Sequence, residues 1–214
     1  MKTLSITFLL FISAFFTVNA QDLTDPVAKK ILAGVSAKFN SATTIKADFI
    51  YTLENKEAGL KVSQPGKLWV KGDKYKVELE QQEIICDSKN VWTYLKDMEE
   101  ATLSEVDPLN DEFKPSELFT IYEKDFDYIY KGEEVSNGKT MQVIDLSPKD
   151  KNKPYYLIRM AIDKKTSEPL EFKLFEKSGN RYTYTIKTLK LNSTMDDSQF
   201  TWNKPASIEV IDLR

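Results

Sequence analysis

A strict alternation of apolar and mostly polar side chains begins at Ile45, and it constrains this chain more than any other feature of its sequence. A strand places successive side chains on opposite faces of a sheet, whereas a helix would scatter this pattern around its axis. The segment therefore predicts a strand with one buried face and one face toward water. The apolar positions are Ile45, Ala47, Phe49, Tyr51 and Leu53, and they alternate with Lys46, Asp48, Ile50, Thr52 and Glu54.

Further segments of strand character follow, almost to the end of the chain. Turn signals such as Asn137-Gly138 and Ser178-Gly179-Asn180 separate consecutive segments, and the stretch from Lys164 to Pro169 has the same character. Because such turns join neighbours in sequence, we expect one antiparallel meander. The strands are expected at 60–71, 74–80, 83–87, 90–95, 101–106, 126–134, 140–147, 155–163, 169–177, 180–191 and 207–212.

One amphipathic helix precedes the strands. Asp25 can cap its start and Pro26 suits the first helical position, so we expect a helix over residues 25–40. Val27, Ile31, Val35 and Phe39 recur every four residues and are expected on its buried face. After Pro115, the pattern Leu118, Phe119, Tyr122 suggests a second short helix among the strands.

A large sheet with so few helices has little to cover its dry face. Many of the apolar strand positions are aromatic, and two interpretations of them remain open. The sheet and helices can form an ordinary filled core, or the sheet can curl and leave a concave apolar cavity under the helices.

The first 20 residues have the features of a secretory signal peptide. An apolar run from Leu9 to Phe16 follows Lys2, and Val18-Asn19-Ala20 is suited to cleavage after Ala20. The run is too short to span a membrane. We therefore expect two parts, a signal peptide at 1–20 and a single soluble domain at 21–214, of 214 − 20 = 194 residues. One cysteine, Cys86, allows no internal disulfide, and its apolar surroundings favour a buried filler.

Composition excludes several classes of function. Without Lys2 the chain has 29 basic and 33 acidic residues, well mixed, which argues against binding nucleic acid or an anionic membrane surface. The absence of histidine removes Ser-His-Asp and Cys-His catalysis and histidine metal sites. Acidic pairs such as Glu99-Glu100 are better explained as solvated surface. We expect no enzyme, no metal and no cofactor.

Several motifs, taken in their order, resemble the LolA family of periplasmic lipoprotein carriers. The resemblance extends over nearly the whole mature chain at low density. One departure stands at Gly72-Asp73, where many family members have Arg-Pro. The matching segments are Ala47-Asp48-Phe49, Gly66-Lys67-Leu68-Trp69-Val70-Lys71, Asp87-Ser88-Lys89-Asn90-Val91-Trp92-Thr93-Tyr94, Lys96 to Thr102, Phe200-Thr201-Trp202-Asn203-Lys204-Pro205 and Val210-Ile211-Asp212.

This resemblance implies a mainly β (α+β) fold, with a single curved, unclosed, barrel-like antiparallel sheet and a few helices forming a lid over a hydrophobic cavity. It implies a monomeric periplasmic carrier that takes the acyl chains of lipoproteins from an inner-membrane lipoprotein-releasing ABC transporter complex to an outer-membrane acceptor. A carrier or sensor of another envelope lipid is the alternative. The residues expected to line the cavity are Phe49, Tyr51, Leu53, Leu68, Val70, Val77, Leu79, Trp92, Tyr94, Leu118, Phe119 and Tyr122.

Overall fold

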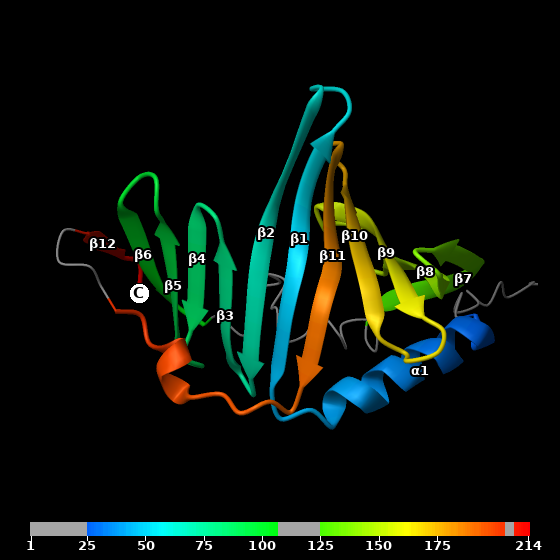
Figure 1. The fold of residues 1–214 in the computed structure, drawn as a ribbon. Helices are drawn as coiled ribbons and strands as arrows, with labels where there is room; N and C mark the ends of the chain where they lie inside the picture. The colour runs from blue at the N-terminus through cyan, green and yellow to red at the C-terminus, as the bar shows by residue number, and fades with distance from the viewer. Residues whose placement is uncertain (1–24, 107–124, 204–207) are drawn as a thin grey trace, which may run out of the picture.

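A single twelve-stranded sheet with one α-helix against it forms the fold (Figure 1). The computed structural model describes residues 25–106, 125–203 and 208–214. The predicted strands are confirmed, with bounds that differ by at most two residues at either end. The elements are α1 (Pro26–Asn40), β1 (Ile45–Asn55), β2 (Leu60–Lys71), β3 (Lys74–Leu79), β4 (Gln82–Cys86), β5 (Asn90–Leu95), β6 (Glu100–Glu105), β7 (Phe126–Ser136), β8 (Lys139–Pro148), β9 (Tyr155–Asp163), β10 (Pro169–Glu176), β11 (Asn180–Leu191), the 3₁₀ turn η2 (Asp197–Phe200) and β12 (Glu209–Asp212).

Two antiparallel meanders make up most of the sheet. Strands β1 to β6 form one and β7 to β11 form the other, and β1 pairs with β11 to join them. The strand order is β12-β6-β5-β4-β3-β2-β1-β11-β10-β9-β8-β7, so β7 and β12 are the two edges and the sheet is unclosed. A single mainly β sheet was expected, and it is confirmed.

The prediction of a wholly antiparallel sheet is wrong at one edge. Strand β12 pairs in parallel with β6, with Val210 opposite Ala101 and Asp212 opposite Leu103. Strand β11 lies in the middle of the sheet, and the chain after it must cross to the far edge before β12 can pair. A long crossover of this kind permits the parallel direction, which no tight hairpin can reach.

The start of α1 is anchored to the β7 edge by Asp25. Its Oδ1 accepts hydrogen bonds from the backbone N–H of Val27 at 2.7 Å and of Ala28 at 3.4 Å, as an N-cap does. Its Oδ2 accepts from the Tyr130 N–H at 3.2 Å, and its own N–H donates to the Tyr128 carbonyl at 3.1 Å. The cap expected from the sequence therefore also fixes where the helix meets the sheet.

The predicted buried stripe of α1 is partly wrong. Val27 is 51% exposed, while Ala28, Leu32, Val35, Ser36 and Phe39 form the buried face. Residues four apart are displaced by about 40° around a helix of 3.6 residues per turn, so a four-residue repeat drifts by about 120° over three steps. Val27 and Phe39 consequently cannot share one face.

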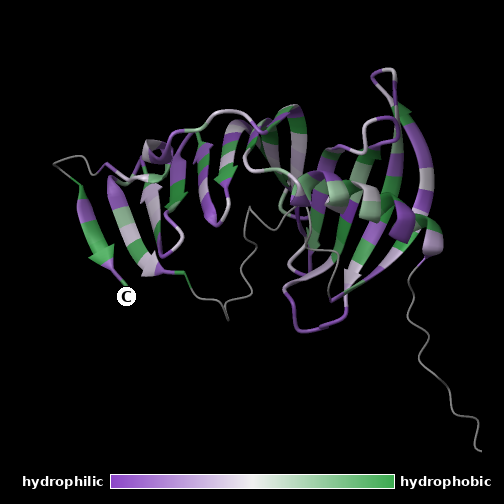
Figure 2. Ribbon diagram, turned by 90° about the horizontal axis from the view of Figure 1, so that it is seen from below, coloured by the Kyte–Doolittle hydropathy of each residue, from purple (hydrophilic) through white to green (hydrophobic). Residues whose placement is uncertain are grey.

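The main core lies between α1 and the strands on both sides of the β1–β11 pair. In Figure 1, α1 runs across the lower ends of β9 to β11, and in Figure 2, which views the sheet from below, it lies nearest the reader in that half. Lys38 near its end pairs with Glu168, with 2.6 Å between Nζ and Oε1. The buried members of this core are Ala28, Leu32, Val35, Phe39, Ile45, Ala47, Phe49, Leu68, Val70, Phe126, Ile144, Leu146, Ile158, Met160, Ile162 and Phe172.

Two predicted features lie outside the described residues, namely the signal peptide at 1–20 and the short helix after Pro115. No helix within the described ranges is long and apolar enough to cross a membrane.

Candidate functional site

The register of the strands divides the sheet into two faces. Directly opposite residues of neighbouring strands point to the same side, so Ile45 shares a face with Val70 and Leu191, and Phe49 shares it with Gly66 and Ile186. We call this the inner face, because the core with α1 is built on it.

Three of the predicted cavity residues are buried in the core of the inner face. Phe49, Leu68 and Val70 are each no more than 6% exposed. The Phe49 ring lies over Gly66 so closely that a Cβ there would come within 2.4 Å of its Cζ atom. The centroid of the ring is also 5.9 Å from that of Tyr184. Phe49 is therefore a packed core residue.

Four other predicted residues also lie on the inner face and are only partly buried. They are Tyr51, Leu53, Val77 and Leu79. Tyr51, Val77 and Leu79 border the core, while Leu53 lies beyond it. Partial exposure makes these side chains available to an apolar ligand.

The apolar character of the inner face continues past the core cluster. Val77 pairs with Ile84 and Cys86 with Val91, so the register places Ile84, Val91 and Leu95 on this face in β4 and β5. Val62, opposite Leu53, extends it along β2 and is 48% exposed. We name the inner-face apolar residues outside the core cluster the open band: Leu53, Val62, Ile84, Val91 and Leu95.

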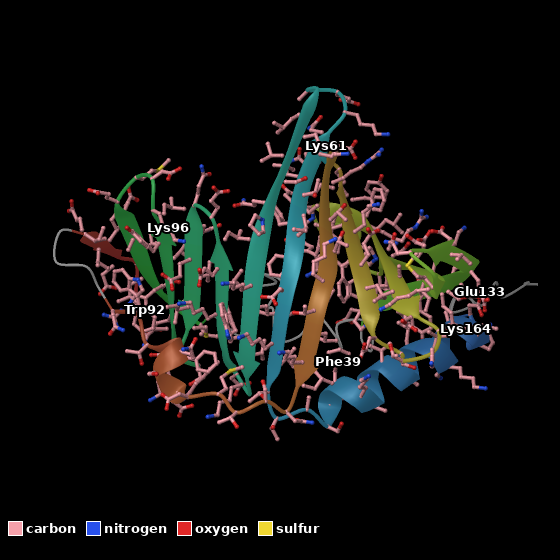
Figure 3. The ribbon with its side chains drawn as sticks, in the orientation of Figure 1. Phe39, Lys61, Trp92, Lys96, Glu133 and Lys164 are labelled. Carbon is pink, nitrogen blue, oxygen red and sulfur yellow. The ribbon has the colours of Figure 1, made fainter. Side chains whose placement is uncertain are left out.

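Trp92 and Tyr94 lie on the opposite, outer face, which corrects their assignment beside Phe49. Trp92 pairs with Ile85, and Ile85 alternates with the inner-face Ile84. The Tyr94 ring centroid is 6.3 Å from that of Trp202, so the C-terminal segment after η2 packs on this side. Figure 3 shows Trp92 on the β5 side of the sheet, far from Phe39 at the end of α1.

The sequence could not separate these faces, because both alternating sets of β5 contain large apolar residues. Val91 and Leu95 form one set, and Trp92 and Tyr94 form the other. Sequence reasoning missed the first set and chose the aromatic one. The only signal for the right choice was the count of residues through the short turns from β2 to β5, which sets the parity. Leu118, Phe119 and Tyr122 lie outside the described residues.

Tyrosines line the inner face between the core and the end of β1. The centroid of the Tyr51 ring is 5.5 Å from that of Tyr184 and 6.3 Å from that of Tyr182. Burial raises the pKa of the Tyr184 phenol well above its ordinary value, and desolvation also raises the pKa of Tyr51 and Tyr182. All three phenols therefore stay neutral at physiological pH and provide mainly ring surface.

A polar cluster closes this face at the turn between β10 and β11. The Glu176 Oε2 atom accepts hydrogen bonds from Ser178 Oγ at 2.8 Å and from Asn180 Nδ2 at 3.3 Å, and Tyr182 Oη lies 3.4 Å from it. Asn55 Nδ2 donates to Asn180 Oδ1 at 2.8 Å. We call Asn55, Glu176, Asn180 and Tyr182 the polar rim.

The chemistry of the inner face is that of binding. Over the ranges that the structure describes, no group of three or more histidine, cysteine or carboxylate side chains is placed to hold a metal ion. Cys86 is buried, with its Sγ 3.7 Å from the Asp73 carbonyl oxygen. Partly exposed apolar side chains beside a hydrogen-bonding rim suit a ligand with a long hydrocarbon part and a polar end.

The sequence and the fold were both compared with known proteins. The family model for LolA, outer membrane lipoprotein carrier protein, matches residues 40–203. An uncharacterized protein of Methanocaldococcus jannaschii is 25% identical over 215 residues, covering 98% of this chain and 60% of the relative. The chain thus spans about three fifths of that relative's length.

Solved structures share the fold at low identity. An uncharacterized conserved protein from Thermus thermophilus superimposes with a TM-score of 0.57 at 15% identity, covering 87% of this chain and 99% of that one. A LolA superfamily protein from Nitrosomonas europaea gives a TM-score of 0.43 at 11% identity, covering 82% and 97%.

Proposed function

Since this chain belongs to the LolA family of outer membrane lipoprotein carrier proteins, we propose that its inner face binds the acyl chains of lipoproteins and carries them between membranes. The open band is the observation that supports this proposal most. A sheet that only formed a core would be expected to bury these residues, yet Val62 remains 48% exposed and the others only partly buried.

The energetics of transfer require such a surface. Each methylene moved from a bilayer into water costs about 0.8 kcal/mol, so the acyl chains of one lipoprotein would cost tens of kcal/mol. A protein can lower this cost only by offering apolar area of its own. The open band, bordered by Tyr51, Val77 and Leu79, is the part of the described inner face that remains available for it.

In this proposal the core half of the inner face supports the site and the open band forms it. Phe49, Leu68 and Val70 hold α1 and the two meanders together, and they are too buried to meet a ligand without rearrangement. The acyl chains then lie along β1 to β5. Trp92 and Tyr94 stabilise the opposite side of the same strands.

The proposal places the protein in the periplasm as a monomer, after cleavage behind Ala20. An inner-membrane lipoprotein-releasing ABC transporter complex is the proposed donor, and an outer-membrane protein is the proposed acceptor. The protein itself would need no cofactor and perform no catalysis, because transfer from one apolar surface to another breaks no covalent bond.

Native mass spectrometry of the protein purified from its own cells tests the proposal. We expect a bound species that dissociates as a triacylated or diacylated lipoprotein or lipopeptide. Recovery of another envelope lipid instead would favour the alternative carrier or sensor. A protein that is free of lipid, and that also fails to take up an acylated peptide from detergent, would contradict both.

A transfer assay separates carrying from simple binding. The loaded protein is mixed with acceptor vesicles, and the acylated peptide is followed after the protein is removed by affinity capture. We expect peptide to leave the protein only when an acceptor is present. Tyr94→Ala is a suitable control variant, because its side chain lies on the outer face.

A further inference from the structure

The polar rim lies at one end of the inner face, one residue pair beyond the last apolar pair. Leu53 lies opposite Tyr182 and Val62, and the next inner-face pair along the same strands is Asn55 with Asn180. Leu174, opposite Tyr182, leads in the same way to Glu176 in β10. Apolar surface therefore changes to hydrogen-bonding surface within one step along four neighbouring strands.

One carboxylate oxygen of the rim is available to a ligand. The Oε2 atom of Glu176 receives the contacts from Ser178, Asn180 and Tyr182. Among the described residues, no donor lies within hydrogen-bond distance of its Oε1 atom, and the side chain is only partly buried. Glu176 can thus accept a further hydrogen bond without giving up those that hold the turn.

Cations at this end of the sheet lie on the other face. Glu54 pairs in register with Lys61 and Arg181, and all three alternate with inner-face residues, so they belong to the outer face. Lys61 marks this end of β2 in Figure 3. At inner-face positions from Tyr51 to Asn55, Leu60 to Gln64, Leu174 to Glu176 and Asn180 to Tyr184, all within the described ranges, there is no lysine or arginine.

From this arrangement we propose that the polar rim receives the polar end of the cargo and selects an uncharged, amide-bearing end over an anionic one. The inference rests on the proposed function and adds to it the direction in which the ligand lies and the chemistry of its head. An amide N–H can donate to the free Glu176 oxygen, as the first peptide groups of an acylated peptide can. A carboxylate or phosphate at the same place would meet a like charge with no cation to offset it.

The size of the preference follows from Coulomb's law. Two like unit charges about 6 Å apart, in surroundings between bulk water and a protein surface, repel each other enough to weaken binding roughly tenfold. Salt should reduce this ratio, because the rim is partly open to solvent.

Displacement of an uncharged fluorescent dye, N-phenyl-1-naphthylamine, by two ligands with the same chain tests the inference. The ligands are N-methyldodecanamide and dodecanoate, used at neutral pH and low salt with the full-length mature protein. We expect the amide to displace the dye at roughly tenfold lower concentration than the acid. Glu176→Gln keeps the hydrogen-bonding shape and removes the charge, so the ratio should fall close to one, mainly through tighter binding of dodecanoate.

Glu54→Gln is the matched control, since it removes the same charge from the outer face at the same end of β1. It should leave the ratio unchanged. If Glu176→Gln does not fold, as judged by its melting curve, Asn180→Asp adds a second carboxylate to the rim and should increase the ratio.

The outcomes separate the two proposals. If both ligands displace the dye equally from the original protein, or if Glu54→Gln lowers the ratio as much as Glu176→Gln, the rim does not select the head group and this inference is wrong. If neither ligand displaces the dye and no dye binds, acyl binding itself is contradicted.

Discussion

Leu53 and Phe49 provide a direct test of where the ligand lies, because they share one strand and one face but differ in burial. Leu53 belongs to the open band and Phe49 to the core. We predict that Leu53→Glu abolishes most acyl binding and spares the fold, whereas Phe49→Ala damages the fold and leaves binding by the folded fraction nearly intact.

The magnitudes follow from burial. A leucine side chain of the open band can cover about three methylenes of an acyl chain, so its loss should weaken binding by about 2.4 kcal/mol, or roughly 50-fold. Because Leu53 is only partly buried, the free energy of unfolding should fall by only about 1 kcal/mol. Phe49→Ala should cost about 3–5 kcal/mol, which in a domain of this size lowers the melting temperature by roughly 6–20 °C.

Both quantities are measured on the same samples, with thermal denaturation for the fold and titration with a fluorescent acyl probe for binding. Thr183→Glu places a carboxylate on the outer face opposite Lys173 and serves as the control for added charge. Unchanged probe affinity in Leu53→Glu would refute the placement of the ligand on the open band. A stable Phe49→Ala variant with lost binding would show instead that Phe49 lines the site.

Three further predictions test the packing and the helix cap. Gly66→Ala should lower the free energy of unfolding by about 1–3 kcal/mol in thermal denaturation, because its Cβ would lie 2.4 Å from Phe49 Cζ, while Lys67→Ala at the exposed neighbouring position should not. Tyr94→Ala should reduce stability by loss of the Trp202 contact and leave the acyl-probe Kd within about twofold, since its side chain lies away from the inner face. The backbone N–H of Val27 is the main cause of the lowered pKa of Asp25, so this group stabilises the fold above about pH 4 and the contribution is lost as the pH falls further. The melting temperatures of the original protein and Asp25→Ala should accordingly differ near neutral pH and converge in acid, and a constant difference would contradict this role.

Much of the fold was predictable because its signals are local. The alternation from Ile45 to Leu53 requires only a pleated backbone with one dry face, and the Asp25-Pro26 pair starts a helix wherever the chain can form one. Family resemblance added the unclosed curved sheet, and the match over residues 40–203 confirms the family.

The candidate site was less predictable, because a residue's face depends on how strands pair. Phe49 and Tyr51 both fit the dry stripe of β1, but only the position of α1 buries the first and leaves the second partly exposed. Trp92 and Tyr94 have the composition of a ligand-binding wall, and yet the register from β2 to β5 places them on the outer face.

The sequence by itself determined which segments are strands, where the helix begins, and which chemistries are absent, since alternation, capping and composition act over a few residues or over the whole chain regardless of its path. Only the tertiary structure decided that β1 pairs with β11, that β12 runs parallel to β6, and that Asn55, Glu176 and Asn180 meet at one rim. Those contacts join residues more than a hundred positions apart, and their energy depends on the packing of the whole sheet, so no local pattern records them.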